Sequence, residues 1–189
     1  LESTCASRLP AVLTRFHKSF PDVRVELQTA TNDALTAAVK EGRLDAAFVV
    51  EIPADRALSA QPVFRERLVL VSSAQHRPIA RPRDIAEDSI IAFSRGCAYR
   101  RILERWMGGR GLATVRVLEL GSYHAIVSCV AAGTGVALLP ESVLDTVSTL
   151  GVKRHALPRV LEQVVTPLIW RKGEGQAAVM ALREQLAAV

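Results

Sequence analysis

The chain has 189 residues, of which 49% are hydrophobic and 23% are charged. This composition is typical of a folded globular protein and excludes a disordered chain. The formal net charge of +5 would suit a nucleic-acid partner, but the basic residues are scattered in groups that are separate in sequence. No apolar run approaches the roughly 20 residues of a membrane-spanning helix. We therefore expect a solvated surface, with neither membrane nor nucleic acid as a direct partner.

The cysteines and the first residues indicate the cellular compartment in which we expect the protein. Cys5, Cys97 and Cys129 form no CxxC pair, which predicts a reducing compartment, the cytoplasm, and no disulfide framework. Residues 1–4 lack the basic and apolar regions of a signal peptide. They are typical of a strand end that runs directly into a helix. We expect an excised domain whose first strand lies mostly upstream.

In chain order, a helix, a strand and a second helix come first. Apolar residues recur at helical spacing over 9–20, and Pro21 stops this helix. Apolar and polar residues alternate over 23–28, which predicts a strand with one buried face. Residues 29–32 supply a cap for a short helix that ends at Gly42.

Three strands are predicted next, at residues 45–50, 58–64 and 67–72. The first is a continuous apolar run, which is typical of a fully buried parallel strand. With an upstream first strand restored, the order becomes a βαβαβ unit. Such a unit predicts a parallel sheet with right-handed crossovers.

The second half of the chain repeats this alternation after a proline-containing boundary at 77–88. Strands are predicted at 89–93, 115–120, 136–139 and 152–157, with helices at 99–107, 122–132 and 140–147. A strand at 164–170 and a helix at 177–188 complete the chain. Two α/β halves with a late return of the chain predict two lobes joined by two crossings.

Four helices are expected to begin beside small polar residues, where strands of a parallel sheet end. These starts lie at residues 3–4, 29–32, 94–97 and 121–124. Helix N-termini present unpaired N–H groups and a partial positive charge, which suit a carboxylate, phosphate or sulfate. Each start is equally explained as an ordinary helix cap. Four of them on one expected rim favour a ligand cleft.

Enzyme signatures are weak. Residues 133–135 lack the third glycine of a dinucleotide fingerprint, and no phosphate-binding loop, nucleophile elbow or metal-ligand spacing is present. We therefore predict no catalytic residue, no cofactor and no metal. Cys97, between Arg95 and Arg100, is either a thiol of lowered pKa or a small buried thiol. His124 has no orienting partner in the sequence.

Several segments together resemble the effector-binding domain of LysR-type transcriptional regulators. They are residues 8–16, 20–23, 42–47 (GRLDAA), 62–64 with 68–71, and 131–140 (AAGTGVALLP). The segments follow the family's order and spacing over almost the whole chain. The resemblance implies an α/β, type II periplasmic-binding-protein-like fold of two Rossmann-like lobes. Lobe one would comprise residues 1–72 plus 163–189, and lobe two residues 73–162.

The resemblance also implies a site for a small molecule between the lobes. Together with the helix starts, Arg95 and Arg100 favour an anionic effector that carries a carboxylate. The family's contacts fall on these positions of the sequence: Ser3, Thr4, Thr29, Thr31, Phe93, Ser94, Gly96 and Cys97, with the neighbourhood of Ser122 and His124.

The partners follow from the same resemblance. The family's effector domains form antiparallel homodimers, which would place residues 9–20 and 23–29 of one subunit against 122–132 of the other. The family's winged helix-turn-helix domain precedes this region, so DNA binding is expected only of a longer protein. We expect a cytoplasmic ligand-sensing regulatory domain, not an enzyme.

Two alternatives remain at this point. A periplasmic-type solute-binding protein for a small anion would share the fold and would carry a secretion signal. An enzyme is the other, because Thr14-Arg15-Phe16 is similar to a motif of prephenate dehydratases, which share a two-lobed architecture.

Overall fold

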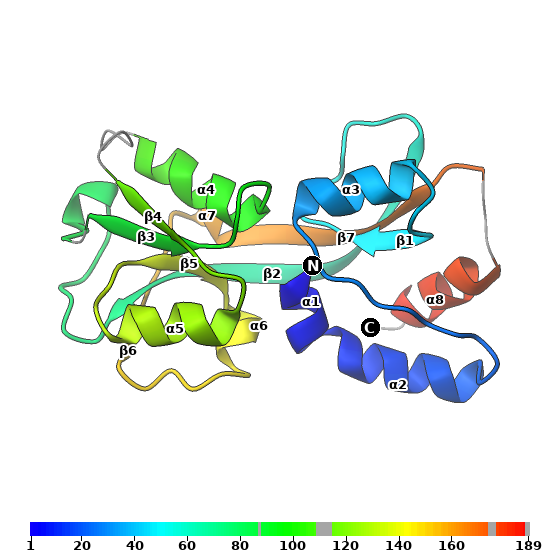
Figure 1. Ribbon diagram of the computed structural model, residues 1–189, viewed down its shortest axis with the longest axis horizontal. Helices are drawn as coiled ribbons and strands as arrows, with labels where there is room; N and C mark the ends of the chain where they lie inside the picture. The colour runs from blue at the N-terminus through cyan, green and yellow to red at the C-terminus, as the bar shows by residue number, and fades with distance from the viewer. Residues whose placement is uncertain (87, 109–114, 174–176, 188–189) are drawn as a thin grey trace. The chain divides into compact units, whose positions relative to one another are not determined.

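The structure is a computed structural model that describes residues 1–86, 88–108, 115–173 and 177–187. Figure 1 shows a mixed α/β chain. The helices are α1 (Glu2–Ser7), α2 (Leu9–Ser19), α3 (Asn32–Lys40), α4 (Ala98–Met107), α5 (Tyr123–Ala131), α6 (Glu141–Leu144), α7 (Arg159–Glu162) and α8 (Ala177–Ala187), with a 3-10 turn at Pro82–Asp84. The strands are β1 (Ala46–Phe48), β2 (Leu58–Ser73), β3 (Ser89–Ala92), β4 (Arg116–Glu119), β5 (Ala137–Pro140), β6 (Val152–His155) and β7 (Gln163–Arg171).

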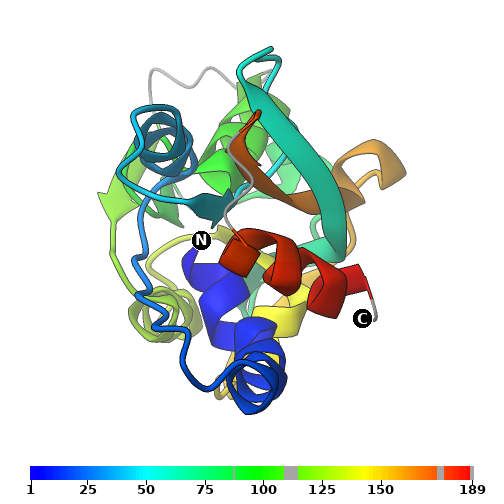
Figure 2. The ribbon, with the colours of Figure 1, turned by 90° about the vertical axis from the view of Figure 1, so that its right-hand side faces the viewer.

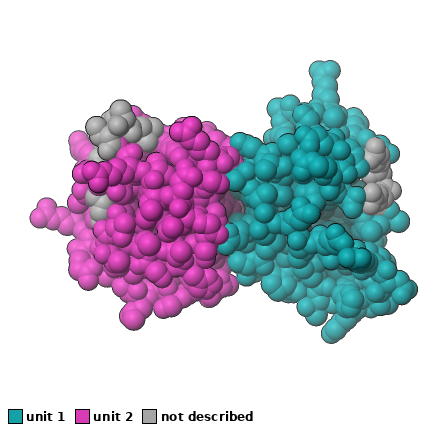
Figure 3. All heavy atoms as spheres, in the orientation of Figure 1, with its two compact units in different colours: residues 1–65, 165–189 teal, residues 66–164 magenta. Residues whose placement is uncertain are grey.

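The chain forms two compact units, drawn in different colours in Figure 3. Unit 1 comprises residues 1–65 and 165–189, and unit 2 comprises residues 66–164. The chain therefore leaves unit 1 within β2 and returns to it within β7.

Strand β2 corrects the prediction of two separate strands at 58–64 and 67–72. Phe64, Glu66 and Leu68 are buried while Arg65 and Arg67 are exposed, so one alternation continues through the expected break. The buried Glu66 carboxylate accepts a hydrogen bond from Ser142 Oγ at 2.7 Å. A buried charged side chain that has a hydrogen-bond partner does not interrupt a strand.

Unit 1 has helices on both faces of the β1–β7 pair (Figures 1 and 2). One face holds α3, where Leu35 and Val39 pack with Ala47, Val49 and Ile169. The other face holds α2 and α8, and its cluster comprises Leu9, Val12, Phe48, Phe64, Leu168, Trp170, Val179 and Leu186. The period-2 alternation of strand side chains divides the apolar run of β1 between these two clusters.

The pairing in unit 1 differs from the parallel sheet that was predicted. β1 is antiparallel to β7, with Ala46 opposite Trp170 and Phe48 opposite Leu168. The reason is the return crossing, because a strand that comes back from unit 2 runs against β1.

The strand predicted at residues 23–28 is also absent, and this prediction was wrong. The segment from 23 to 31 contains no assigned strand, and Val25 and Leu27 are 45% and 55% exposed. A strand needs a neighbouring backbone to pair its N–H and C=O groups. Among the described residues, no strand lies hydrogen-bonded beside this segment.

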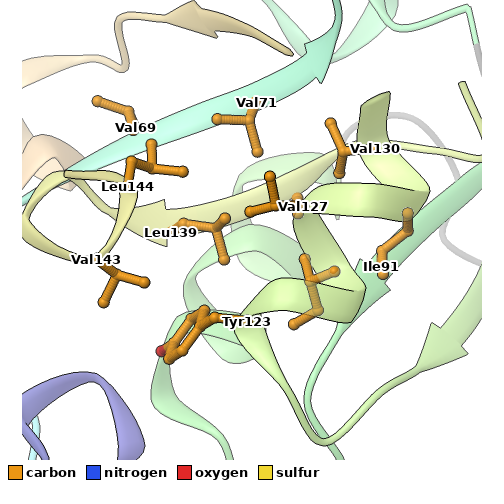
Figure 4. Packing of buried hydrophobic residues seen from close by; sticks show 11 residues of the cluster. Val69, Val71, Ile91, Tyr123, Val127, Val130, Leu139, Val143 and Leu144 are labelled. Atoms are coloured by element: carbon orange, nitrogen blue, oxygen red, sulfur yellow. The ribbon is translucent and has the colours of Figure 1, made fainter. Parts of the chain in front are cut away.

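Unit 2 combines parallel and antiparallel pairs. β3 and β4 are parallel, with Ile90 opposite Val117, whereas β5 and β6 are both antiparallel to β2. Figure 4 shows the core where α5 packs on β2 and β5, with Val127 between Val71 and Leu139. Gly135 is required beside this core, because a Cβ atom there would lie 2.5 Å from the Ser89 carbonyl oxygen.

Most other predicted elements are confirmed. The helices expected at 9–20, 99–107, 122–132 and 177–188 correspond to α2, α4, α5 and α8; Ala188 lies outside the described residues. The chain is helical near residues 3–4 as expected, but the separation of α1 from α2 at Arg8 was not predicted, and neither was α7. Helices α1 and α7 contain six and four residues, too few for an apolar period to be recognised.

Candidate functional site

Ser3 and Thr4 lie within α1 rather than before it. The helix begins at Glu2, and Leu1 at its start makes no side-chain capping bond. Both residues are buried, and the Ser3 carbonyl accepts a hydrogen bond from Ser7 Oγ at 2.8 Å. The prediction that these two residues form a capping turn was therefore wrong, because the helix starts one residue earlier than expected.

Thr31 caps α3 as predicted. Its Oγ1 accepts a hydrogen bond from the Ala34 N–H at 3.4 Å, while Thr29 is exposed. The following residue, Asn32, has a role that the sequence did not reveal. Its buried Oδ1 accepts the Val50 N–H at 2.6 Å, which joins the start of α3 to the end of the β1 run.

Residues 93–97 connect β3 to α4, as the sequence predicts for a loop at the carboxyl end of a strand. Gly96 has a φ of +90°, a left-handed conformation that favours glycine. Cys97 is the residue before α4. Burial raises the pKa of its thiol, and the N–H groups of Arg100 and Tyr99 offset only part of this effect. The thiol is therefore not the activated nucleophile that nearby arginines would suggest.

Arg100 is not available to an anionic ligand. Its side chain is 6% exposed and pairs with the carboxylates of Glu104 at 2.7 Å and Glu119 at 2.5 Å. A third hydrogen bond goes to the Phe93 carbonyl oxygen at 3.2 Å. Two carboxylates thus neutralise the guanidinium inside unit 2, and this corrects its use as support for an anionic effector. Arg95 is exposed.

Ser122 lies directly before α5 and makes no side-chain capping bond. His124 is exposed, whereas the intervening Tyr123 is buried. The Phe93 and Tyr123 rings meet edge to face, with centroids 4.8 Å apart. The contact brings the loop after β3 and the start of α5 together within unit 2. Tyr123 itself was missed, because nothing local marks it as the point of contact.

The described residues around this contact enclose little space. A cavity of about 10 Å³ lies among Phe93, Cys97, Arg100, Tyr123 and their apolar neighbours. That volume has room for about one water molecule. Within unit 2 alone, the starts of α4 and α5 therefore offer N–H and hydroxyl groups at a surface rather than a preformed chamber.

The described ranges contain no candidate metal site and no candidate membrane-spanning helix. No group of three or more histidine, cysteine, aspartate or glutamate side chains in them could hold a metal ion. Within the same ranges, every helix is too short or too polar to cross a membrane.

Comparison with curated proteins relates the chain to bacterial transcriptional regulators. It is 31% identical over 173 residues to the HTH-type transcriptional regulator GltR of Bacillus subtilis, covering 91% of this chain and 58% of GltR. It is 32% identical over 167 residues to CzcR of Bacillus cereus, covering 88% of this chain and 57% of CzcR. The chain thus spans less than two thirds of these relatives, whose names are those of regulators and not of enzymes.

Solved structures confirm the fold. The effector-binding domain of BenM with its effector benzoate matches with a TM-score of 0.79 and 22% identity, covering 98% of this chain and 87% of that one. The regulatory domain of the OxyR2 E204G variant from Vibrio vulnificus matches with a TM-score of 0.80 and 16% identity, covering 98% and 92%. The α/β fold is therefore type II periplasmic-binding-protein-like, as predicted.

A family model described as the LysR substrate binding domain matches residues 1–189. The match leaves no part of the chain outside the family's domain. Together with the sequence relatives and the shared fold, it shows that this chain belongs to the LysR substrate-binding domain family, a family of transcriptional regulators rather than enzymes.

Proposed function

We propose that the chain is the ligand-sensing domain of a cytoplasmic bacterial LysR-type regulator. The observation that carries this proposal is the family match over all 189 residues. The match also favours a regulator over a periplasmic solute-binding protein. Because the chain spans 58% of GltR and 57% of CzcR, we assign DNA binding, as part of the same proposal, to the portion of a longer regulator that this chain does not match.

The effector that we propose is a small carboxylate. A protein of the same fold, BenM, binds benzoate, and the helix starts of this chain offer uncharged donors for such a group. Because Arg100 is neutralised internally, backbone N–H groups and hydroxyls such as that of Ser122 carry the recognition. The residues proposed to contact the effector are Ser3, Thr4, Thr29, Thr31, Phe93, Ser94, Gly96, Cys97, Ser122 and His124.

A thermal-shift screen of organic acids against their neutral amides tests this proposal. A ligand that binds only the folded state at 100 times its Kd adds about 2.7 kcal/mol of stability. We expect carboxylates to raise the Tm and the matching amides to leave it unchanged. A consistent preference for amides or for cationic ligands would contradict the proposal.

Ser122→Ala gives the residue-level test of the same site. The Ser122 hydroxyl makes no capping bond, so its removal leaves the start of α5 intact while removing a proposed donor. We expect weaker binding of the carboxylate by roughly fivefold to tenfold, the range of one hydrogen bond. Ser148→Ala, at an exposed position outside the proposed contacts and outside residues 122–132, is the matched control and should bind normally.

We further propose a homodimer in which residues 9–20 and 23–29 meet residues 122–132 of a second subunit. The exposed side chains of Val25 and Leu27 support this proposal. Leu27→Glu should give a monomer in sedimentation equilibrium. Leu150→Glu changes a side chain that is 89% exposed but lies outside the proposed interface, and it should leave the dimer intact.

A further inference from the structure

Helix α4 carries two arginines close to its N-terminus. Arg100 and Arg101 are the third and fourth residues of the helix, and its first turn contains no acidic residue. A cation at this end of a helix faces the positive end of the helix dipole, which is unfavourable. Residues that break a local preference in this way are often found at functional sites, so the position of the two side chains requires a physical reason.

Both guanidinium groups reach back to the loop that connects β3 to α4. Arg100 Nη1 donates a hydrogen bond to the Phe93 carbonyl oxygen at 3.2 Å. Arg101 Nη1 donates to the Gly96 carbonyl oxygen at 3.3 Å. Arg100 is itself fixed inside unit 2 by its two carboxylate partners. Two adjacent residues of one helix thus hold the loop near its beginning and near its end.

The loop between these two hydrogen bonds is a tight turn. The Cys97 N–H donates to the Ser94 carbonyl oxygen at 3.3 Å, and Gly96 at the third position of the turn has a φ of +90°, as is typical of a type II turn. The Cys97 carbonyl oxygen accepts the Arg101 N–H at 3.2 Å. Donors within unit 2 therefore occupy four carbonyl groups of the loop, those of Phe93, Ser94, Gly96 and Cys97.

The direction of these carbonyl groups determines where the N–H groups of the loop point. In a trans peptide the N–H points away from the carbonyl group of the preceding residue. Because the Phe93 carbonyl is directed at Arg100, the Ser94 N–H points away from that guanidinium. Because the Ser94 carbonyl closes the turn, the Arg95 N–H points out of the turn. Among the described residues, no backbone carbonyl accepts either N–H, and both residues are exposed.

We propose that Arg100 and Arg101 are positioning residues for the effector. They hold the carbonyl groups of the loop so that two successive N–H groups, those of Ser94 and Arg95, face the carboxylate of the effector. Successive N–H groups in a turn are typical donors for an anion. Neither arginine touches the effector, which agrees with the neutralisation of Arg100 by its two carboxylates. The proposal rests on the function proposed above and adds residues that act on its site through the loop.

Arg101→Met tests the proposal, because it removes the bond to the loop without breaking the buried ion pairs of Arg100. The control is Arg105→Met, which removes the same charge one turn further along α4 from an exposed position. Proton–nitrogen NMR follows the isotope-labelled chain during titration with acetate, and acetamide at constant ionic strength is the neutral comparison. We expect acetate, and not acetamide, to shift the Ser94 and Arg95 amide signals. Arg101→Met should bind acetate roughly fivefold to tenfold more weakly, the range of one hydrogen bond, whereas the control should bind it normally.

Arg101→Lys separates the position of the loop from the charge of the side chain. Lysine retains the charge and can donate a single hydrogen bond to the Gly96 carbonyl, so we expect it to recover most of the acetate response. The Tm of Arg101→Met should lie within roughly 2 °C of that of Arg105→Met, because the Arg101 side chain is only partly buried. A weaker acetate response without a matching loss of stability distinguishes positioning of the loop from a general structural role.

Two results would overturn the proposal. Equal acetate responses of Arg101→Met and Arg105→Met would show that the bond to the Gly96 carbonyl does not position the loop. Ser94 and Arg95 signals that do not respond to acetate in the unmodified chain would show that the loop is not a carboxylate donor. Either result is distinct from failure of the proposed effector class, which would appear as the absence of any rise in Tm with organic acids in the thermal-shift screen.

Discussion

At the scale of single residues, Arg100 shows how burial changes a role that position suggests. Its neighbourhood in sequence, beside Cys97 and a helix start, favours an anion site. The folded chain instead places Glu104 one helical turn away and Glu119 at the end of β4 against the guanidinium. The Glu104 contact is visible as an i,i+4 pair, whereas the Glu119 contact depends on the β3–β4 pairing.

Replacing Arg100 tests this structural role. Arg100→Met should lower the free energy of unfolding by about 1–3 kcal/mol, because the buried guanidinium loses its hydrogen bonds to the Glu104 and Glu119 carboxylates and to the Phe93 carbonyl. Urea denaturation measures the change. The control is Arg95→Met at an exposed position, which should stay within about 0.5 kcal/mol of the original chain. Equal stabilities of the two variants would contradict the structural role.

Thr166 presents the opposite case, a buried polar atom with no hydrogen-bond partner among the described residues. Removing such a hydroxyl with an isosteric side chain recovers its desolvation cost. Thr166→Val should therefore raise the free energy of unfolding by about 1 kcal/mol. Thr31→Val, which removes the α3 cap, should lower it by about 1 kcal/mol. Thermal unfolding measures both changes. If the Tm of the two variants shifted in the same direction, the result would contradict this account.

At the scale of elements, hydrogen bonds between residues that are distant in the sequence hold together strands and loops that side-chain periodicity predicts only one by one. The end of β2, strand β6 and the loop after β2 meet at His155. Its Nδ1 accepts the Ile79 N–H at 3.0 Å, so the proton resides on Nε2, which lies 2.8 Å from Ser72 Oγ. The Ser72 hydroxyl donates in turn to the Ser73 carbonyl at 3.0 Å. A single neutral tautomer satisfies all three groups.

His155→Ala should cost about 2–4 kcal/mol, because it leaves the buried Ile79 N–H without its acceptor, removes the donor to the Ser72 hydroxyl and opens a cavity. His124→Ala, at an exposed position, is the control and should change stability by less than about 0.5 kcal/mol. Long-range proton–nitrogen NMR of the original chain provides a second readout. A signal from the Nδ1–H tautomer of His155 would contradict the hydrogen-bond pattern.

At the scale of the whole molecule, pairing between distant segments determines the architecture. The chain leaves unit 1 through β2 and returns through β7, so β7 meets β1 in the antiparallel direction. The same long connections bring β5 and β6 to β2. Local periodicity cannot distinguish these pairings from a parallel sheet, because it reports which face of a strand is buried and not which strand lies beside it.

The pH dependence of unfolding should report the buried Leu1 amine. Its pKa in the folded chain is lowered by burial from the ordinary 8.0. Between the lowered value and 8.0, the unfolded chain binds more protons, so stability rises with pH in this window and falls as pH drops. The 189-residue chain should therefore gain stability between pH 7 and pH 8 relative to a control chain with a short glycine–serine segment added before Leu1, in which no charged amine is buried at this position. Parallel pH profiles of the two chains would contradict this expectation.

The sequence by itself determined the position of most helices and strands, the helix cap within residues 29–32 and the family. These features depend on side-chain period, capping chemistry or short motifs, which are properties of neighbouring residues. Only the tertiary structure decided the antiparallel pairing of β1 with β7, the neutralisation of Arg100 and the unpaired state of residues 23–28. Each of these features depends on which backbone segment or charged side chain from a distant part of the sequence lies beside it. The packing of the whole chain determines that neighbour, and the local sequence pattern does not.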